Sequence, residues 1–326
     1  MKSTAVTRKF LKLYKGFHKG LPPVVVDGKT LDRETQLLLQ ASKLPDLCRM
    51  SVPMARRQVD LLARFLSQVQ VDTPLQIRNE VLTLGSNKRR IKIRRYVNEQ
   101  SESDHTLLYF HGGGWVVGNL DSHDGMCRVL SATSGVEVIS VDYPLAPEHP
   151  YPAAGDVVLQ TFEHYLEKKP AESLLMGGDS AGGHLTVEAL LACKKKSLPQ
   201  PSLQLLIYPT VSGLREPTAS LETYGHDFYL TLDTMKWFRN HYKMAKGIDF
   251  FEDLSGLAPA LVVVAGFDPL LDEGRMLHQA LQDHGVRSQY LEFPSLIHGF
   301  AQMIGVVKEA RRAMKQIGLE IKQNLS

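Results

Sequence analysis

The sequence predicts an α/β fold, in which a mostly parallel central sheet has helices on both faces and a helical cap. Three observations predict it. From about residue 75 onward, short apolar runs alternate with longer stretches of helical character, as in doubly wound sheets. Glycine-rich or polar motifs follow several of these runs directly, where such sheets bind ligands. Residues 1–70 and 213–253 interrupt the alternation and have helical character instead.

The first 70 residues are predicted to form an N-terminal helical cap segment. Apolar side chains recur at helical spacing within residues 10–17. A second helix is predicted from Thr30 to Ala41, capped by Thr30 or Asp32, and a third from Pro53 to Val69. The first helix is basic and amphipathic, which suits a membrane surface. We prefer the alternative, in which it packs on its own protein.

Residues 71–326 are predicted to form one α/β domain with a cap insertion at about residues 213–253. Residues 75–84 and 91–97, separated by Gly85 to Asn87, predict a β-hairpin. The insertion is rich in aromatic side chains, most of which we expect in the core of the helical layer. Further strands are predicted at 106–110, 136–141, 173–176, 203–207, 260–265 and 288–293, and helices at 125–134, 153–168, 184–193 and 274–284.

Composition excludes several classes of function. The 326 residues carry a net charge of +3, too small to indicate a nucleic-acid partner. The three cysteines lie far apart in the sequence, which argues against a disulfide framework or a zinc site and fits a reducing compartment. No apolar run is long enough for a membrane span, and no signal-peptide pattern is present. We therefore expect a cytoplasmic protein without a metal or cofactor.

The stretch from Gly178 to Gly183 is the strongest motif. It has the Gly-x-Ser-x-Gly pattern, with Ser180 at the centre, and lies between a predicted strand and a predicted helix. A serine on such a sharp turn projects its hydroxyl from the sheet, as a nucleophile must. Ser180 is therefore the predicted nucleophile. Asp179 beside it is predicted to anchor the turn.

The second motif is the run from His111 to Trp115, which contains three consecutive glycines directly after a predicted strand. Bare glycine amides let a substrate approach closely and form an oxyanion hole. The pattern of a phosphate-binding loop is absent. His111 is predicted to shape the loop as a hydrogen-bond donor.

The third motif is a pair of loops that supply an acid and a base. Asp268 follows a predicted apolar strand, and His298 follows the last strand, predicted to end at Phe293. A histidine takes the proton of a serine hydroxyl, and a carboxylate orients that histidine. Asp272 competes with Asp268 for the orienting role. We prefer Asp268 because it comes immediately after the strand, whereas Asp272 lies in a predicted first helical turn.

Taken together, these motifs and the run from Asp142 to Pro150 resemble the hormone-sensitive-lipase-like family of α/β-hydrolases, also called bacterial family IV esterases. The resemblance implies an α/β-hydrolase fold with Ser180 as nucleophile, His298 as general base and Asp268 as its partner. It implies an oxyanion hole from the amides of Gly113, Gly114 and Ala181, supported by Gly112. It also implies hydrolysis of short- to medium-chain carboxylic esters without a cofactor, and a homodimer.

Two departures from the family pattern concern the acyl pocket. His184 stands where an asparagine is common, and the connection before Asp253 is shorter than usual.

The function predicted from sequence is that of a serine carboxylesterase acting on a small-molecule ester through an acyl-enzyme. An amidase, a lactonase or a deacetylase would use the same triad, so the sequence leaves these open. A non-catalytic ligand-binding module is a further alternative, which the presence of His298 disfavours. A true lipase is less favoured because nothing indicates a large exposed apolar lid.

Overall fold

The computed structural model describes residues 2–3, 20–42, 47–86, 88–211, 217–244, 250–251 and 253–325. The helix predicted within residues 10–17 lies outside these ranges. Part of the predicted insertion, residues 212–216, 245–249 and 252, lies outside them as well.

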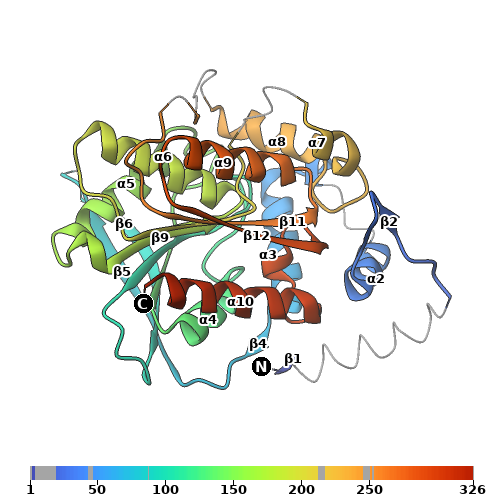
Figure 1. Cartoon of the computed structure of the whole chain (residues 1–326), viewed down its shortest axis with the longest axis horizontal. Coiled ribbons are helices and arrows are strands. Elements are labelled where there is room, and N and C mark those ends of the chain that lie inside the picture. Colours follow the sequence, from blue (N-terminus) through green and yellow to red (C-terminus); the bar gives the residue numbers. More distant parts are fainter. Residues whose placement is uncertain are drawn as a thin grey trace.

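An eight-stranded sheet forms the centre of the protein (Figure 1). Its strands lie in the order β12-β11-β10-β9-β7-β8-β6-β5, and β6 alone runs in the opposite direction to the other seven. Strands β7, β9, β10 and β11 are buried along their whole length, as expected for strands covered on both faces. The strands are β5 (Leu75–Leu84), β6 (Arg89–Asn98), β7 (Thr106–Phe110), β8 (Glu137–Val141), β9 (Leu174–Asp179), β10 (Leu203–Ile207), β11 (Ala260–Phe267) and β12 (Ser288–Ile297).

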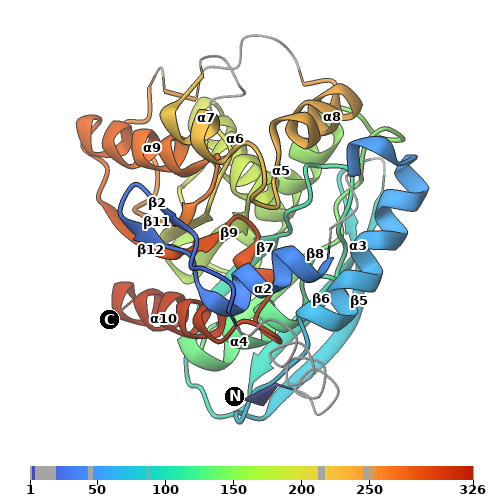
Figure 2. The ribbon, with the colours of Figure 1, turned by 90° about the vertical axis from the view of Figure 1, so that its right-hand side faces the viewer.

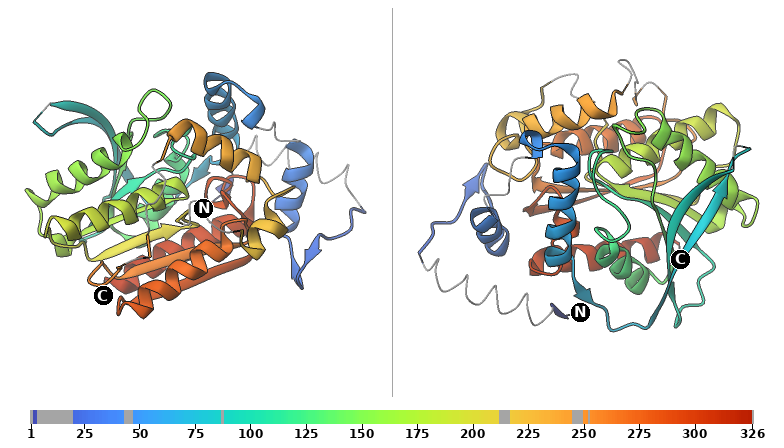
Figure 3. Two further views of the ribbon diagram at one scale, coloured as in Figure 1. Left: turned by 90° about the horizontal axis from the view of Figure 1, so that it is seen from above. Right: turned by 180° about the vertical axis from the view of Figure 1, so that it is seen from behind.

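Helices cover both faces of the sheet (Figures 1 and 3). Helices α4 (Asp124–Ser134) and α10 (Lys308–Asn324) lie on one face. The other face carries α5 (Ala153–Leu166), α6 (Ala181–Lys195) and α9 (Leu271–Asp283). The predicted α/β-hydrolase fold, with its mostly parallel sheet between two helical layers, is confirmed.

Our sequence analysis missed α10. Its buried residues include Ala310, Ala313, Met314, Ile317 and Ile321, which follow the spacing of an amphipathic helix. The periodicity was therefore present in the sequence.

The remaining helices lie beyond the carboxyl ends of the parallel strands (Figure 2). They come from two distant parts of the chain: α2 (Arg33–Ser42), the 3₁₀ turn η1 (Leu47–Arg49) and α3 (Val52–Leu66) from the first, and α7 (Ala219–Tyr224) and α8 (Leu232–Tyr242) from the second. Turn η1 and helix α8 contact each other. That these two segments together form a cap over the sheet remains a prediction.

Arg56 of α3 ties the first of these segments to the sheet. Its guanidinium donates to the carbonyl oxygens of Val116 and Ala146 at 2.9 and 3.0 Å. It also makes a two-pronged ion pair with Glu148 at 2.9 and 2.7 Å. One side chain thus holds α3 against the loops that follow β7 and β8.

The ends of several elements differ from the sequence-based expectation. The N-cap of α2 is Asp32, whose Oδ1 accepts from the Thr35 amide at 2.8 Å, whereas Thr30 lies in the short strand β3 (Lys29–Thr30). This strand pairs with β2 (Val25–Val26), and β1 (Lys2–Ser3) pairs with β4 (Val69–Gln70).

Strand β12 continues past Phe293 to Ile297, through Pro294. The chain tolerates this proline because β12 is an edge strand, whose amides need partners on one side only.

Among the described residues, no helix combines the length and apolar character needed to cross a bilayer.

Candidate active site

The turn between β9 and α6 carries Ser180. Its backbone has φ 53° and ψ −116°, a sparsely populated conformation that stores strain at functional sites. A Cβ at Gly182 would lie 1.8 Å from the carbonyl oxygen of Phe110, and one at Gly178 would lie 2.2 Å from the same atom. The two flanking glycines are therefore required by the close approach of β7.

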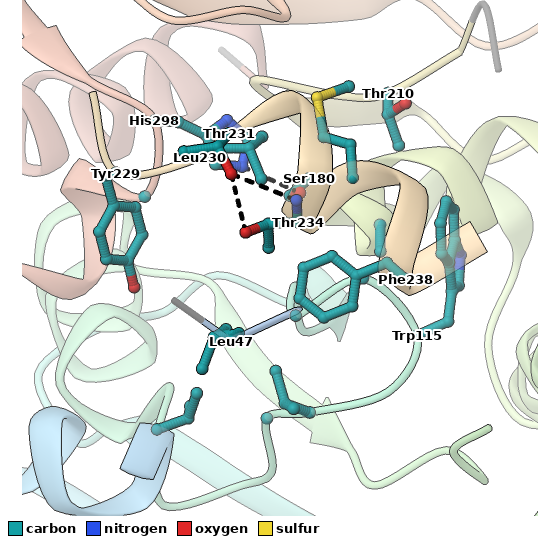
Figure 4. A pocket seen from close by; sticks show the side chains of 18 of the residues that line it. Leu47, Trp115, Ser180, Thr210, Tyr229, Leu230, Thr231, Thr234, Phe238 and His298 are labelled. Carbon is teal, nitrogen blue, oxygen red and sulfur yellow. Dashed lines mark hydrogen bonds between the residues drawn. The ribbon is translucent and has the colours of Figure 1, made fainter. Parts of the chain in front are cut away.

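His298 joins Ser180 to Asp268 (Figure 4 shows the first pair). The Nε2 atom of His298 lies 3.1 Å from the Ser180 hydroxyl oxygen, and its Nδ1 lies 2.8 Å from Asp268 Oδ2. The other oxygen of Asp268 accepts from the Leu270 amide at 2.7 Å. Asp268 is fully buried, and His298 nearly so. With Nδ1 donating to the carboxylate, Nε2 is left free to accept the serine proton.

Asp272, the competing acid, has other partners. Its Oδ2 accepts from the Ser220 amide at 2.8 Å, and its Oδ1 pairs with Arg275 at 3.4 Å. It therefore ties α7 to α9, while Asp268 contacts the histidine.

The loop after β7 brings Gly113 and Gly114 to the same cavity as Ser180 and Ala181. Gly113 has φ 113° and Gly114 has φ 57°, which are backbone conformations that residues other than glycine rarely adopt. A Cβ at Gly114 would lie 2.1 Å from the ring of Phe238 on α8. The glycines thus allow both the backbone conformation of this loop and the close packing of α8 against it.

The side chain of Asp179 fixes this loop through hydrogen bonds. Its Oδ1 accepts from the Tyr109 hydroxyl at 2.7 Å and from the Gly112 amide at 2.8 Å, and lies 3.4 Å from His123 Nε2. Burial alone would raise the pKa of Asp179, but His123 and these two hydrogen bonds hold the pKa below its ordinary value. A buried carboxylate thereby links the turn that carries Ser180 to the glycine loop.

His111 makes its contacts within the loop region. Its Nδ1 lies 2.8 Å from the carbonyl oxygen of Gly112, and its ring stacks on Tyr143 at 4.3 Å. Burial lowers the pKa of His111 to about 3. The imidazole is therefore neutral near pH 7.

A cavity of about 600 Å³ opens beside Ser180. In Figure 4, His298 and Tyr229 lie on one side of Ser180, and Thr210 and Trp115 lie on the other. Most of the lining is apolar and comes from both cap segments, including Leu39, Leu47, Val59, Leu62, Leu230, Met235, Phe238 and Met244. Such a site suits a small molecule with an apolar part.

Comparison with known proteins shows the family of this chain. Residues 107–302 match the family described as alpha/beta hydrolase fold. The chain belongs to this family. Its predicted likeness to the hormone-sensitive-lipase-like group of these enzymes is confirmed.

Relatives of this α/β hydrolase include two bacterial enzymes. The carboxylic ester hydrolase LipN of Mycobacterium tuberculosis is 33% identical over 304 residues, which cover 86% of this chain and 79% of LipN. An ethyl acetate hydrolase of Pseudomonas putida is 33% identical over 303 residues, which cover 87% of this chain and 94% of that enzyme.

Solved esterase structures superimpose well. The ester hydrolase EH1AB1 from the Lake Arreo metagenome, complexed with a bipyridine phosphonate derivative, has a TM-score of 0.83 at 30% identity and covers 90% of this chain and 98% of its own. A hyperthermophilic esterase from Pyrobaculum calidifontis has a TM-score of 0.81 at 32% identity with the same coverage.

Sequence reasoning missed several residues of the site in this α/β hydrolase. His123 reaches Asp179 from the start of α4, and Tyr229 and Arg239 line the cavity from the second cap segment. No local motif marks these residues, because cap segments meet the sheet through tertiary packing alone.

Among the described residues, no cluster of His, Cys, Asp or Glu is arranged to hold a metal ion, and Cys48, Cys127 and Cys193 are free thiols.

His184, where the family commonly has asparagine, lies behind the cavity wall. Its Nδ1 donates to the carbonyl oxygen of Thr210 at 3.1 Å, and its ring packs edge-on against Trp115 at 5.0 Å. One helical turn on, Glu188 Oε2 lies 4.0 Å from His184 Nε2 and has no hydrogen-bond partner in the described part of the chain. Burial raises the pKa of Glu188 from 4.5 to about 7, although a hydrogen bond from Tyr151 opposes this rise.

The raised pKa of the largely buried Glu188 side chain predicts that the stability of the fold depends on pH. Because its folded pKa lies above its unfolded pKa, the stability it contributes is present below pH 4.5 and is lost as pH rises to about 7. Glu188→Gln mimics the protonated form, so it should match the wild type below about pH 5 and exceed it by roughly 3 kcal/mol near pH 8.

Urea unfolding of both proteins across this pH range measures the difference. Glu172→Gln removes an exposed carboxylate and serves as the control, with a pH profile that follows the wild type. If the free energies of unfolding of the wild type and of Glu188→Gln differ by the same amount at every pH, Glu188 does not have the raised pKa assigned to it.

Proposed function

We propose that this α/β hydrolase is a serine carboxylesterase that hydrolyses short- to medium-chain carboxylic esters through an acyl-enzyme. The observation that carries the proposal is the chain of two hydrogen bonds, at 3.1 and 2.8 Å, from Ser180 through His298 to Asp268. The relatives named as a carboxylic ester hydrolase, an ethyl acetate hydrolase and an acetyl esterase support the substrate class.

In the first half-reaction, Ser180 attacks the ester carbonyl carbon while His298 Nε2 takes the hydroxyl proton. Asp268 holds the ring through Nδ1 and stabilises the imidazolium that forms. When the tetrahedral intermediate collapses, the C–O bond to the alcohol breaks and His298 returns the proton to the departing oxygen. The acyl group remains on Ser180 as an ester.

The negative charge on the carbonyl oxygen needs donors during this step. We assign them to the amides of Gly113, Gly114 and Ala181, because these residues line the cavity around Ser180. The helix that starts at Ala181 adds the positive end of its dipole. The Asp179 carboxylate fixes the loop through Gly112, which keeps these donors in place before the substrate arrives.

The second half-reaction uses water. His298 takes a proton from the water, whose oxygen attacks the acyl carbon. Collapse then breaks the bond to Ser180, and His298 returns the proton to the serine oxygen. The products are one alcohol and one carboxylic acid, and the enzyme regains its starting state.

The size of the cavity supports an acyl group longer than acetyl. A volume of about 600 Å³ lies within the range of small-molecule sites, and an apolar lining favours a hydrocarbon chain. A homodimer and a cytoplasmic location remain predictions of the sequence.

A series of p-nitrophenyl esters from acetate to decanoate, together with the matched anilides, tests the proposal. We expect esters to be hydrolysed with an optimum at short to medium chains, and anilides to be cleaved far more slowly. Equal rates on an ester and its anilide would favour an amidase, and hydrolysis of neither would favour a non-catalytic binding module.

A further inference from the structure

The cavity contains one cation that the described residues leave without a close partner. Arg239, in the last turn of α8, lines the cavity together with Met235 and Phe238 of the same helix. Within the part of the chain that the structure describes, its guanidinium makes no ion pair and donates no hydrogen bond. A half-buried guanidinium usually pairs with a carboxylate or a phosphate. Arg239 has five N–H groups available for such a partner.

The carboxylate that influences Arg239 is already engaged. Glu273 Oε2 accepts from the Val211 amide at 2.6 Å and from the Thr210 hydroxyl at 3.2 Å. Burial lowers the pKa of Arg239, and the charge of Glu273 offsets this only in part. The cation is thus partly desolvated without full compensation.

Arg239 lies toward the Thr210 side of the cavity. Arg239 lies within electrostatic range of Glu273 and His184, and both of these residues contact Thr210. In Figure 4, Thr210 lies on the opposite side of Ser180 from His298.

That position identifies the part of the substrate that meets Arg239. In the proposed mechanism, His298 protonates the departing alcohol, so the alcohol faces His298. The acyl chain then extends to the other side, toward Thr210 and Arg239. The lining also contains two carboxylates, those of Asp179 and Asp227. Asp227 precedes α8, whereas Arg239 lies in the last turn of that helix. Asp179 already accepts from the Tyr109 hydroxyl and the Gly112 amide.

We propose that Arg239 binds an anionic group at the end of the acyl chain, so that the preferred substrates are half-esters of dicarboxylic acids. The inference rests on the proposed esterase function and adds the class of acid. The guanidinium pairs with the terminal carboxylate through two parallel hydrogen bonds, and the apolar lining between it and Ser180 accommodates the methylene chain. Arg239 selects the substrate and takes no part in the bond-breaking steps.

Ethanol release from monoethyl half-esters, from succinate to sebacate, tests the proposal against neutral ethyl esters of equal chain length. At the optimal length we expect wild-type kcat/KM for the half-ester to exceed that for the neutral ester by about tenfold, the usual worth of a charged hydrogen bond. Arg239→Met should abolish this ratio, and Arg239→Lys should keep part of it.

Lys236→Met is the matched control, because it removes the same charge from an exposed position on α8 outside the cavity lining. For Lys236→Met, the ratio of kcat/KM for the half-ester to kcat/KM for the neutral ester should equal that of the wild type. Added salt should lower the wild-type ratio but leave that of Arg239→Met unchanged. The salt dependence of the wild type tests the proposal even if a variant does not fold.

The proposal is overturned if the wild type prefers neutral esters at every chain length, or if Arg239→Met keeps the wild-type ratio. Hydrolysis of neutral esters alone would refute only this inference. A wild type that hydrolyses neither series would refute the esterase function itself.

Discussion

Replacing Ser180 by alanine should reduce ester hydrolysis by about 10⁵-fold, because removing the nucleophile of a serine hydrolase disables the whole catalytic unit. The hydroxyl lies 3.1 Å from His298 Nε2, on a strained turn that projects it into the cavity. Alanine fits this turn without a clash, so the fold should be retained. The loss should therefore appear in kcat, with little change in stability.

Release of p-nitrophenol from a short-chain ester measures this effect. Ser202→Ala, which removes a hydroxyl beside the start of β10 outside the cavity lining, is the control and should retain full activity. Thermal unfolding of all three proteins checks the fold. Ester turnover by Ser180→Ala at the wild-type rate would remove the proposed mechanism.

Asp268→Asn should have the second largest effect, with kcat falling by roughly 10⁴-fold. An amide at this position can donate to His298 Nδ1, which places the proton on Nε2 and prevents that atom from accepting the serine proton. Because the Leu270 amide can still donate to the Asn carbonyl oxygen, the loop should keep its shape. The loss of kcat should thus come from the wrong tautomer of His298 and not from a change in folding.

Asp272→Asn provides a sharp comparison, since Asp272 lies four residues on and was the rival candidate in the sequence. Its carboxylate binds the Ser220 amide, so its replacement should lower stability modestly and leave kcat within a few-fold. Equal losses of kcat for the two variants would contradict the assignment of the orienting acid to Asp268.

Much of the fold could be predicted because the sheet is buried on both faces. The largely apolar runs of β7, β10 and β11 indicated the positions of these strands closely, and the glycines around Ser180 marked the turn between β9 and α6. The helix starts were placed too late: α6 begins at Ala181 and α9 at Leu271, a few residues before the sequence suggested. Glycine in the first turn of α6 hid its start, because glycine is a poor helix former.

The site could be predicted only where chemistry imposes a local pattern. A sharp turn needs Gly178 and Gly182 next to Ser180, and the strand ends bring Asp268 and His298 to one edge of the sheet. Arg239 of α8 and Tyr229, which precedes this helix, have no such pattern, since this part of the chain meets the sheet through packing between distant segments. His123 was missed for a related reason, because its partner Asp179 is 56 residues away in the chain.

The central claim is that Ser180 is a nucleophile activated by His298, and covalent labelling by an organophosphate tests it most directly. Intact-protein mass spectrometry after treatment with diethyl p-nitrophenyl phosphate should show one added diethylphosphoryl group on the wild type, and peptide mapping should locate it on Ser180. Ser180→Ala should remain unlabelled, and Asp268→Asn should label far more slowly. A wild type that takes up no label, or a label that persists in Ser180→Ala, would contradict the account.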